Sequence, residues 1–157
     1  MDINRIIATV LGAVGAITAP VFSQLYGEGK VVSTSATIFV ILLALDWISG
    51  VRASKKDGSY GSEYGIDGVF RTVFILLFPA LAHLLDVALG LPNIFFIFVV
   101  VDLGYHILQS STANGIRAGW GRLMPNTALN FLTKWVKSEL DAKVARAEKR
   151  LMQKRGE

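Results

Sequence analysis

Four long stretches with very few charged residues dominate this chain of 157 residues. The first, residues 6–27, holds no charge over 22 positions, and a helix of that length crosses a hydrocarbon core of about 30 Å. Three more follow at residues 31–51, 72–90 and 91–109. A water-soluble domain of this size would keep roughly a quarter of its residues charged, whereas this chain keeps 18%. We therefore predict an all-α membrane protein with three to four transmembrane helices.

The C-terminal part of the chain has a different composition. Residues 134–157 hold eight Lys or Arg and four Asp or Glu, so they carry the whole formal net charge of +4. Apolar residues from Leu129 to Leu151 recur every three or four positions, which predicts one amphipathic helix. We expect a transmembrane domain over 1–110, a connector over 111–126 and a basic cytoplasmic helix over 127–157. That helix either lies on anionic lipid or bundles with copies of itself.

The distribution of Lys and Arg predicts the orientation in the membrane. With four spans, fifteen basic residues fall on one side and only Lys30 falls on the other. The positive-inside rule then places both termini and the loop before the third span in the cytoplasm, facing the anionic leaflet. If the first stretch lies along the membrane instead, only its own side changes. The basic residues expected at the membrane surface are Arg52, Lys55, Lys56, Arg71, Lys134, Lys137, Lys143, Arg146, Lys149 and Arg150.

The composition argues against catalysis. The chain has no cysteine and two histidines, which excludes disulfides, thiolate nucleophiles and most metalloenzyme sites. It contains no phosphate-binding glycine loop and no nucleophile elbow. The basic tail has one aromatic residue, Trp135, and no nucleic-acid-binding motif. We expect a non-enzyme with no cofactor, no metal site and no nucleic-acid partner.

Two aspartates lie within the apolar stretches. Asp46 is near the inner end of the second stretch, where its carboxylate can pair with Arg52 or Arg71, or take part in a helix contact or a water-lined path. Asp102 is about 16 Å into the fourth stretch, close to the midplane. A charged carboxylate at that depth has to face protein or water, or else be protonated.

Histidines accompany the intramembrane acids. Asp102 and His106 lie at i, i+4 on one helix, and His83 and Asp86 lie at i, i+3 on another, so each pair can share a hydrogen bond. Such groups serve as proton relays, or join helices by hydrogen bonds worth about 0.6 kcal/mol each. In an oligomer, a ring of Asp102 side chains would hydrate a shared interior.

Small residues repeat at intervals of four in the first stretch. Ala8, Gly12 and Ala16 form one row, and Gly15 lies beside it. Such rows let helix backbones approach closely in lipid. They predict self-association of copies or packing within one copy, and the pattern alone does not choose between them.

Three short motifs follow one another in this apolar region. They are Asp46-Trp47-Ile48-Ser49-Gly50, Gly65-Ile66-Asp67-Gly68-Val69-Phe70-Arg71 and Ala82-His83-Leu84-Leu85-Asp86. Their order and spacing resemble the toxin-secretion/phage-lysis holin family, whose signature D-[YW]-[IL]-[TS]-G closes a membrane helix. The resemblance covers roughly residues 35 to 130. It departs at residues 102–110, where both glutamates of the family pattern are absent and Asp102 stands at its first asparagine.

This resemblance implies a function. A protein of that family would accumulate in the cytoplasmic membrane, associate with its own copies and permeabilise the bilayer, thereby releasing an endolysin or another protein without a signal peptide. Physical chemistry alone leaves two alternatives open. One is a small proton- or ion-coupled carrier that uses Asp102, His106, His83 and Asp86. The other is a membrane scaffold that docks a partner through its basic tail.

Overall fold

The computed structural model describes residues 2–156, apart from the side chains of residues 4, 10, 17 and 64. All secondary-structure elements of the described residues are helices, and these residues contain no strand. Its elements are α1 (Ile3–Tyr26), α2 (Lys30–Lys56), α3 (Ser62–Leu89), α4 (Ile94–Ala118), the 3-10 turn η1 (Trp120–Leu123), α5 (Asn126–Trp135) and α6 (Lys137–Arg155). The first four helices are long and apolar enough to cross a membrane. The predicted all-α membrane fold is therefore confirmed.

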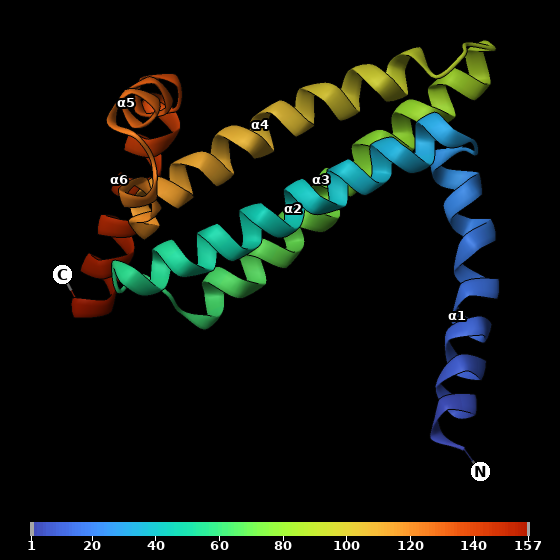
Figure 1. The fold of residues 1–157 in the computed structure, drawn as a ribbon, viewed down its shortest axis with the longest axis horizontal. Helices are drawn as coiled ribbons and strands as arrows, with labels where there is room; N and C mark the ends of the chain where they lie inside the picture. The colour runs from blue at the N-terminus through green and yellow to red at the C-terminus, as the bar shows by residue number, and fades with distance from the viewer. Residues whose placement is uncertain (1, 157) are drawn as a thin grey trace.

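Helices α2, α3 and α4 run side by side as a three-helix bundle (Figure 1). Its small core consists of Phe39 and Leu43 from α2 and Ile107 from α4. Most other large apolar side chains of these helices point outward and are exposed. Since exposed apolar surface on this scale is unfavourable in water, it marks the part of the bundle that contacts lipid.

Short turns and caps set the ends of the bundle helices. Gly90 ends α3 in a left-handed conformation with φ +67°, as the turn signal predicts. Helix α3 begins at Ser62, ten residues before the predicted span, because the polar residues ahead of the apolar stretch also become helical. Helix α4 likewise continues to Ala118, through the first half of the predicted connector. These extensions carry polar residues beyond the apolar segment at one end of the bundle.

Helix α1 does not pack alongside the bundle. Figure 1 shows it leaving the opposite end from α5 and α6, pointing away across the bundle axis. Its main contact is with α3, where the Tyr26 hydroxyl donates to the Leu76 carbonyl at 3.0 Å. The row predicted to pack, Ala8, Gly12, Gly15 and Ala16, is exposed, and a Cβ at Gly12 or Gly15 would meet nothing within 4 Å. Packing of this row within one copy is thus not observed, and its self-association stays a prediction.

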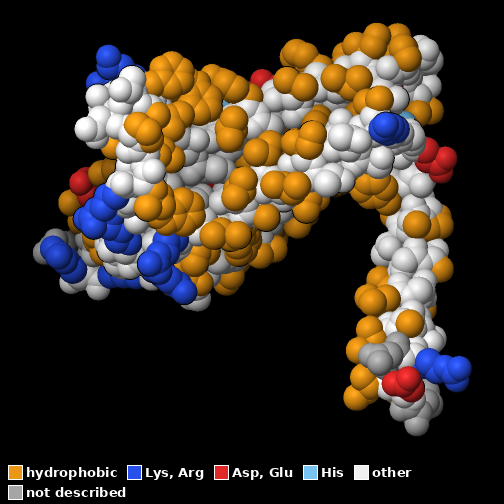
Figure 2. Space-filling view, viewed as in Figure 1, with side chains coloured by type: hydrophobic (Ala, Val, Ile, Leu, Met, Phe, Trp, Pro, Cys, Tyr) orange, Lys and Arg blue, Asp and Glu red, His pale blue; other side chains and the backbone are white. Residues whose placement is uncertain are grey.

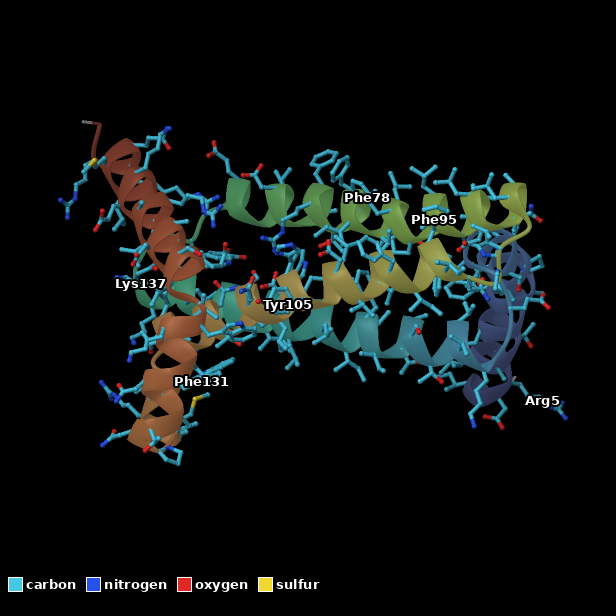
Figure 3. The ribbon with its side chains drawn as sticks, turned by 90° about the horizontal axis from the view of Figure 1, so that it is seen from above. Arg5, Phe78, Phe95, Tyr105, Phe131 and Lys137 are labelled. Carbon is cyan, nitrogen blue, oxygen red and sulfur yellow. The ribbon has the colours of Figure 1, made fainter. Side chains whose placement is uncertain are left out.

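The C-terminal segment differs from the single helix that the apolar spacing predicts. It breaks at Val136, whose side chain is fully buried, between α5 and α6. The preceding Trp135 donates its indole N–H to the Tyr105 hydroxyl of α4 at 3.1 Å. The contact of Trp135 with α4 lies next to this break, so the apolar residues from Leu129 to Leu151 are divided between two helices. Figure 3 shows α5 and α6 lying across the end of the bundle.

The joint between α1 and α2 yields a prediction with a matched control. Gly27 and Gly29 both have positive φ, at +86° and +104°, so alanine is strained at either position. Only at Gly27 would the new Cβ also meet a neighbour, since it would lie 2.6 Å from the His83 ring. We expect Gly27→Ala to detach α1 from α3, and Gly29→Ala to leave that contact in place. Hydrogen exchange at residues 22–26 in detergent measures the difference, and equal exchange in the two variants would contradict it.

Candidate functional site

The carboxylate of Asp46 is the centre of a buried polar network. The residue is 4% exposed and lies on the face of α2 that packs against the bundle. Its Oδ2 accepts a hydrogen bond from Arg71 Nη2 of α3 at 2.7 Å. Its Oδ1 accepts hydrogen bonds from Ser110 Oγ at 2.5 Å and Asn114 Nδ2 at 3.0 Å, both from α4. One side chain therefore joins three helices, and of the two basic partners predicted, Arg71 rather than Arg52 is the one used.

The network extends to the C-terminal helix through Lys143. Its ammonium group donates to Ser110 Oγ at 3.0 Å and lies 3.5 Å from Glu139 of the same helix. Burial lowers the pKa of Lys143, while the charges of Asp46 and Glu139 act in the opposite direction. Lys143 was predicted to lie at the membrane surface, but it is 7% exposed. Its aliphatic stem is covered because α6 packs against α4, so it fastens α6 to the bundle instead of contacting lipid headgroups.

A second ion pair lies beside this network, where α2 ends. Arg117 of α4 pairs with Asp57, which also accepts hydrogen bonds from the backbone and hydroxyl of Ser59. Burial acts to raise the pKa of the Asp57 carboxyl, but the hydrogen bonds from Ser59 and Arg117 outweigh it and lower the pKa. Arg117 also donates to Asn114 Oδ1 at 3.4 Å, which links this pair to the Asp46 network.

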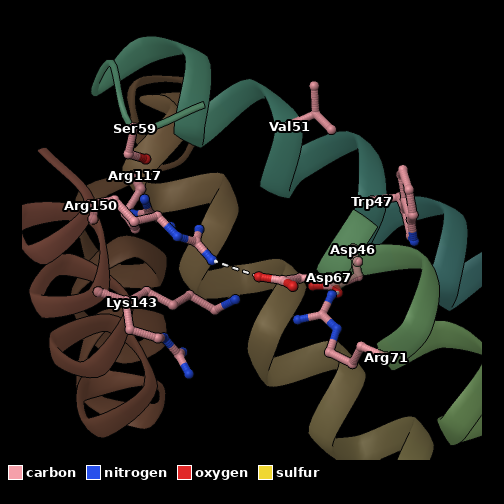
Figure 4. Close-up of a pocket in the computed structure, with 12 residues that line it drawn as sticks. Asp46, Trp47, Val51, Ser59, Asp67, Arg71, Arg117, Lys143 and Arg150 are labelled. Atoms are coloured by element: carbon pink, nitrogen blue, oxygen red, sulfur yellow. Dashed lines mark hydrogen bonds and ion pairs between the residues drawn. The ribbon is translucent and has the colours of Figure 1, made fainter. Parts of the chain in front are cut away.

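A cavity of about 220 Å³ opens between these groups (Figure 4). Arg71, Arg117, Lys143, Arg146 and Arg150 line it, together with Asp46 and Asp67. The basic groups are each matched with an acid, and Arg150, for example, lies 3.8 Å from Asp67. The arrangement is that of a structural charge network. The described residues contain no group of three side chains suited to holding a metal ion.

The geometry explains the Asp-Trp-Ile-Ser-Gly motif. Trp47 donates its indole N–H to Thr72 Oγ1 at 2.9 Å, and its ring packs over Gly68, where a Cβ would approach it to 3.3 Å. Ser49 and Gly50 are buried on the side of α2 that faces the bundle. Asp46 and Trp47 thus hold α3, and the two small residues permit close packing. Ile48 points outward toward the lipid-exposed surface.

Asp86 has a capping role that its predicted pairing with His83 does not describe. Its carboxylate accepts hydrogen bonds from the backbone N–H groups of Phe95 at 3.0 Å and Phe96 at 2.8 Å, in the first turn of α4. An acid at a helix N-terminus satisfies free donors and interacts favourably with the helix dipole. His83 packs against Gly27 instead, and its Nδ1 is buried without a hydrogen-bond partner in the described chain.

Asp102 and His106 lie on the outer face of α4. The Asp102 side chain is 56% exposed, and its Oδ1 is 3.9 Å from His106 Nε2, which is too long for a hydrogen bond. Tyr105 and Gln109 occupy the same face and are hydrogen-bonded to each other at 3.2 Å. These four residues, which we call the outer polar stripe, lie on the face of α4 away from the bundle core; Tyr105 contacts Trp135 of α5 there, while Asp102 and His106 are left exposed.

Sequence reasoning missed Ser110 and Asn114, which complete the Asp46 site. Both are small polar residues, and their i, i+4 spacing places them on one face of α4, with Arg117 a further turn along. That spacing was a usable signal. It identifies a polar face, but the partner on α2 becomes evident only when the helices are packed.

Residues 21–119, more than half of the chain, match the model of the bacteriophage holin family. The chain belongs to this family. The matched region of this holin-family protein contains α2, α3, α4 and the Asp46, Arg71, Ser110 and Asn114 side chains. Helices α5 and α6, including Lys143, lie outside it.

Individual relatives are similar over a shorter region. The uncharacterized protein Lin0175 of Listeria innocua is 36% identical over 73 residues, which cover 46% of this chain and 50% of the relative. The uncharacterized protein BH0965 of Halalkalibacterium halodurans is 34% identical over 74 residues, covering 47% and 53%. The chain thus spans about half the length of these curated relatives. No solved structure matches it significantly.

Proposed function

We propose that this holin-family protein associates with its own copies and permeabilises the cytoplasmic membrane, releasing an endolysin or another protein that lacks a signal peptide. The observation that carries the proposal is the outer polar stripe of Asp102, Tyr105, His106 and Gln109 on a helix apolar enough to span a bilayer. A single copy leaves Asp102 and His106 of this stripe exposed.

The free-energy cost of placing the outer polar stripe against lipid favours assembly of several copies. An aspartate near the middle of a membrane helix costs about 2.5–3.5 kcal/mol on insertion scales if it meets lipid. The bundle offers it little shelter, because its side chain is 56% exposed. Neighbouring copies that turn these stripes toward one another would surround Asp102 with polar groups and water. A water-filled interior follows from that arrangement, and it is what a lesion in the membrane requires.

The orientation is part of the same proposal. The basic last turns of α2 and the basic helices α5 and α6 lie at one end of the bundle, and Figure 2 shows most of the visible Lys and Arg side chains there. We place this end in the cytoplasm by the positive-inside rule. The assignment holds whether α1 inserts into the membrane or lies along its outer face. The exposed row of small residues in α1 is a further surface for contacts between copies.

The carrier alternative has weaker support in the structure. Its four proposed groups are divided between two places, because Asp86 is buried at the start of α4 while Asp102 and His106 face outward. Holin-family proteins are in general not enzymes, and we propose that this chain has no catalytic activity of its own.

Expression of the chain in a bacterium, without any other lysis protein, tests the proposal. We expect the membrane potential to collapse and a cytoplasmic reporter enzyme to appear outside the cells. Cells that keep their potential while the inserted protein accumulates would overturn the proposal. Flux of one small ion with the reporter retained would support the carrier instead.

A further inference from the structure

A second basic cavity lies at the end of α2 and shares no lining residue with the cavity of the Asp46 network. Its volume is about 380 Å³, and four exposed cations line it, namely Arg52, Lys55 and Lys56 from the last turns of α2 and Arg122 from η1. None of the described residues in its lining is acidic. The cavity therefore concentrates positive charge at the end of a membrane helix.

The charges of this cavity are not neutralised within the described chain. Lys56 donates to the carbonyl of Arg117 at 3.1 Å, and Lys55 lies 5.3 Å from the ring centre of Tyr60. None of the four cations has an acidic partner in an ion pair among the described residues. In the Asp46 cavity, by contrast, each cation is close to an acid. Four adjacent uncompensated cations repel one another, and a bound anion would relieve that repulsion.

An apolar groove continues from this cavity. Trp47, Ile48, Val51 and Trp120 line it, and it shares Arg52 and Lys55 with the basic cavity. Trp47 precedes Arg52 by five residues along α2, a rise of about 7.5 Å. Because α2 runs toward the basic end of the bundle, the groove lies on the membrane side of the cavity. Tryptophans at this level are typical of the membrane–water interface.

We propose that the cavity and groove together bind one anionic phospholipid of the cytoplasmic leaflet. The phosphate would lie among Arg52, Lys55, Lys56 and Arg122, and the first part of an acyl chain would lie along Trp47 and Ile48. The basic cavity suits the phosphate and the apolar groove suits the acyl chain. The groove lies deeper in the membrane than the cavity, as the acyl chain lies deeper than the phosphate. The inference rests on the orientation given under the proposed function, and it adds a defined ligand site to it.

The test measures lipid retained by the purified full-length protein in mild detergent, read by native mass spectrometry. Dioleoylphosphatidylglycerol is the anionic probe, and dioleoylphosphatidylcholine is the neutral one. We expect one phosphatidylglycerol per copy in the wild-type protein. The double variant Arg52→Gln with Arg122→Gln should weaken this binding about tenfold or more. The control Lys30→Gln with Arg155→Gln removes the same charge from exposed positions outside the cavity and should bind as the wild type does.

Three results would overturn the lipid site. They are equal losses in the two double variants, equal retention of phosphatidylcholine, and full displacement of phosphatidylglycerol by millimolar inorganic phosphate. The last would assign the cavity to free phosphate. Because lipid retention is measured without any permeabilisation, its failure leaves the proposed function standing, and failure of lysis leaves a positive binding result unaffected.

Discussion

Replacing Asp46 with alanine is expected to lower the free energy of unfolding by about 3 kcal/mol, because three hydrogen-bond donors lose a buried, charged acceptor. The carboxylate accepts hydrogen bonds from Arg71, Ser110 and Asn114, and its charge also stabilises the buried Lys143. Alanine leaves these donors without this acceptor and Arg71 without its counter-charge, while Lys143 keeps only Glu139. The contacts of α2 with both α3 and α4 should weaken together.

The measurement is unfolding of the purified protein in mild detergent by added denaturing detergent, followed by circular dichroism. Asp67→Ala is the matched control, because the Asp67 side chain is 71% exposed and its substitution removes one ion pair, the 3.8 Å contact with Arg150. We expect Asp67→Ala to lower the free energy of unfolding by less than about 1 kcal/mol, because that ion pair is exposed. The loss of stability for Asp46→Asn should lie between those of Asp46→Ala and Asp67→Ala, since asparagine keeps a hydrogen-bond acceptor but lacks the charge. If Asp46→Ala unfolds at the same point as Asp67→Ala, the Asp46 network does not hold the bundle.

Replacing Asp102 with leucine is expected to abolish permeabilisation while the bundle stays folded. The side chain is 56% exposed and its nearest ionisable neighbour, His106, is on the same helix, so few contacts within the bundle depend on it. Leucine makes the outer face of α4 compatible with lipid and removes about 2.5 kcal/mol of the drive to assemble. That corresponds to a loss of between tenfold and a hundredfold in the association constant for each contact.

Release of the cytoplasmic reporter after induction measures this effect. Asp102→Asn keeps a polar group and should retain most of the activity. Val101→Leu, at the adjacent position, which is 66% exposed, should release the reporter as the wild type does. Full release by Asp102→Leu, at the same level of inserted protein, would show that the outer polar stripe is not part of the lesion.

The membrane helices were predictable because their signal is local. Long apolar stretches, the Gly90 turn and the motif ending at Gly50 each depend on a short run of sequence. The pairing of Asp46 with Arg71 was also within reach, since a buried acid at an interface needs a nearby base. The extension of α3 and α4 beyond the apolar stretches was not predictable from the sequence, because the polar residues at their ends become helical through contacts with other elements.

The features that sequence analysis missed depend on how helices pack. The spacing of Asp102 and His106 places them on one face, but whether that face points inward depends on which side of α4 meets α2. Lys143 reads as a surface residue on a basic helix, and its burial follows from the break at Val136 and the docking of α6 on α4. Asp86 reads as a partner for the nearby His83, yet the turn brings it to the free N–H groups of the next helix.

The most direct test of the account compares single cysteines at two positions of equal depth in a chain that has no cysteine of its own. His106 is twelve residues after the start of α4 and Leu77 is twelve residues before the end of α3, and their side chains are both well exposed in one copy. After induction in intact membranes, we predict that a charged, water-soluble thiol reagent labels the His106→Cys protein rapidly and the Leu77→Cys protein hardly at all. Equal labelling of the two, or none of either, would contradict the claim that assembled copies enclose water along the outer polar stripe.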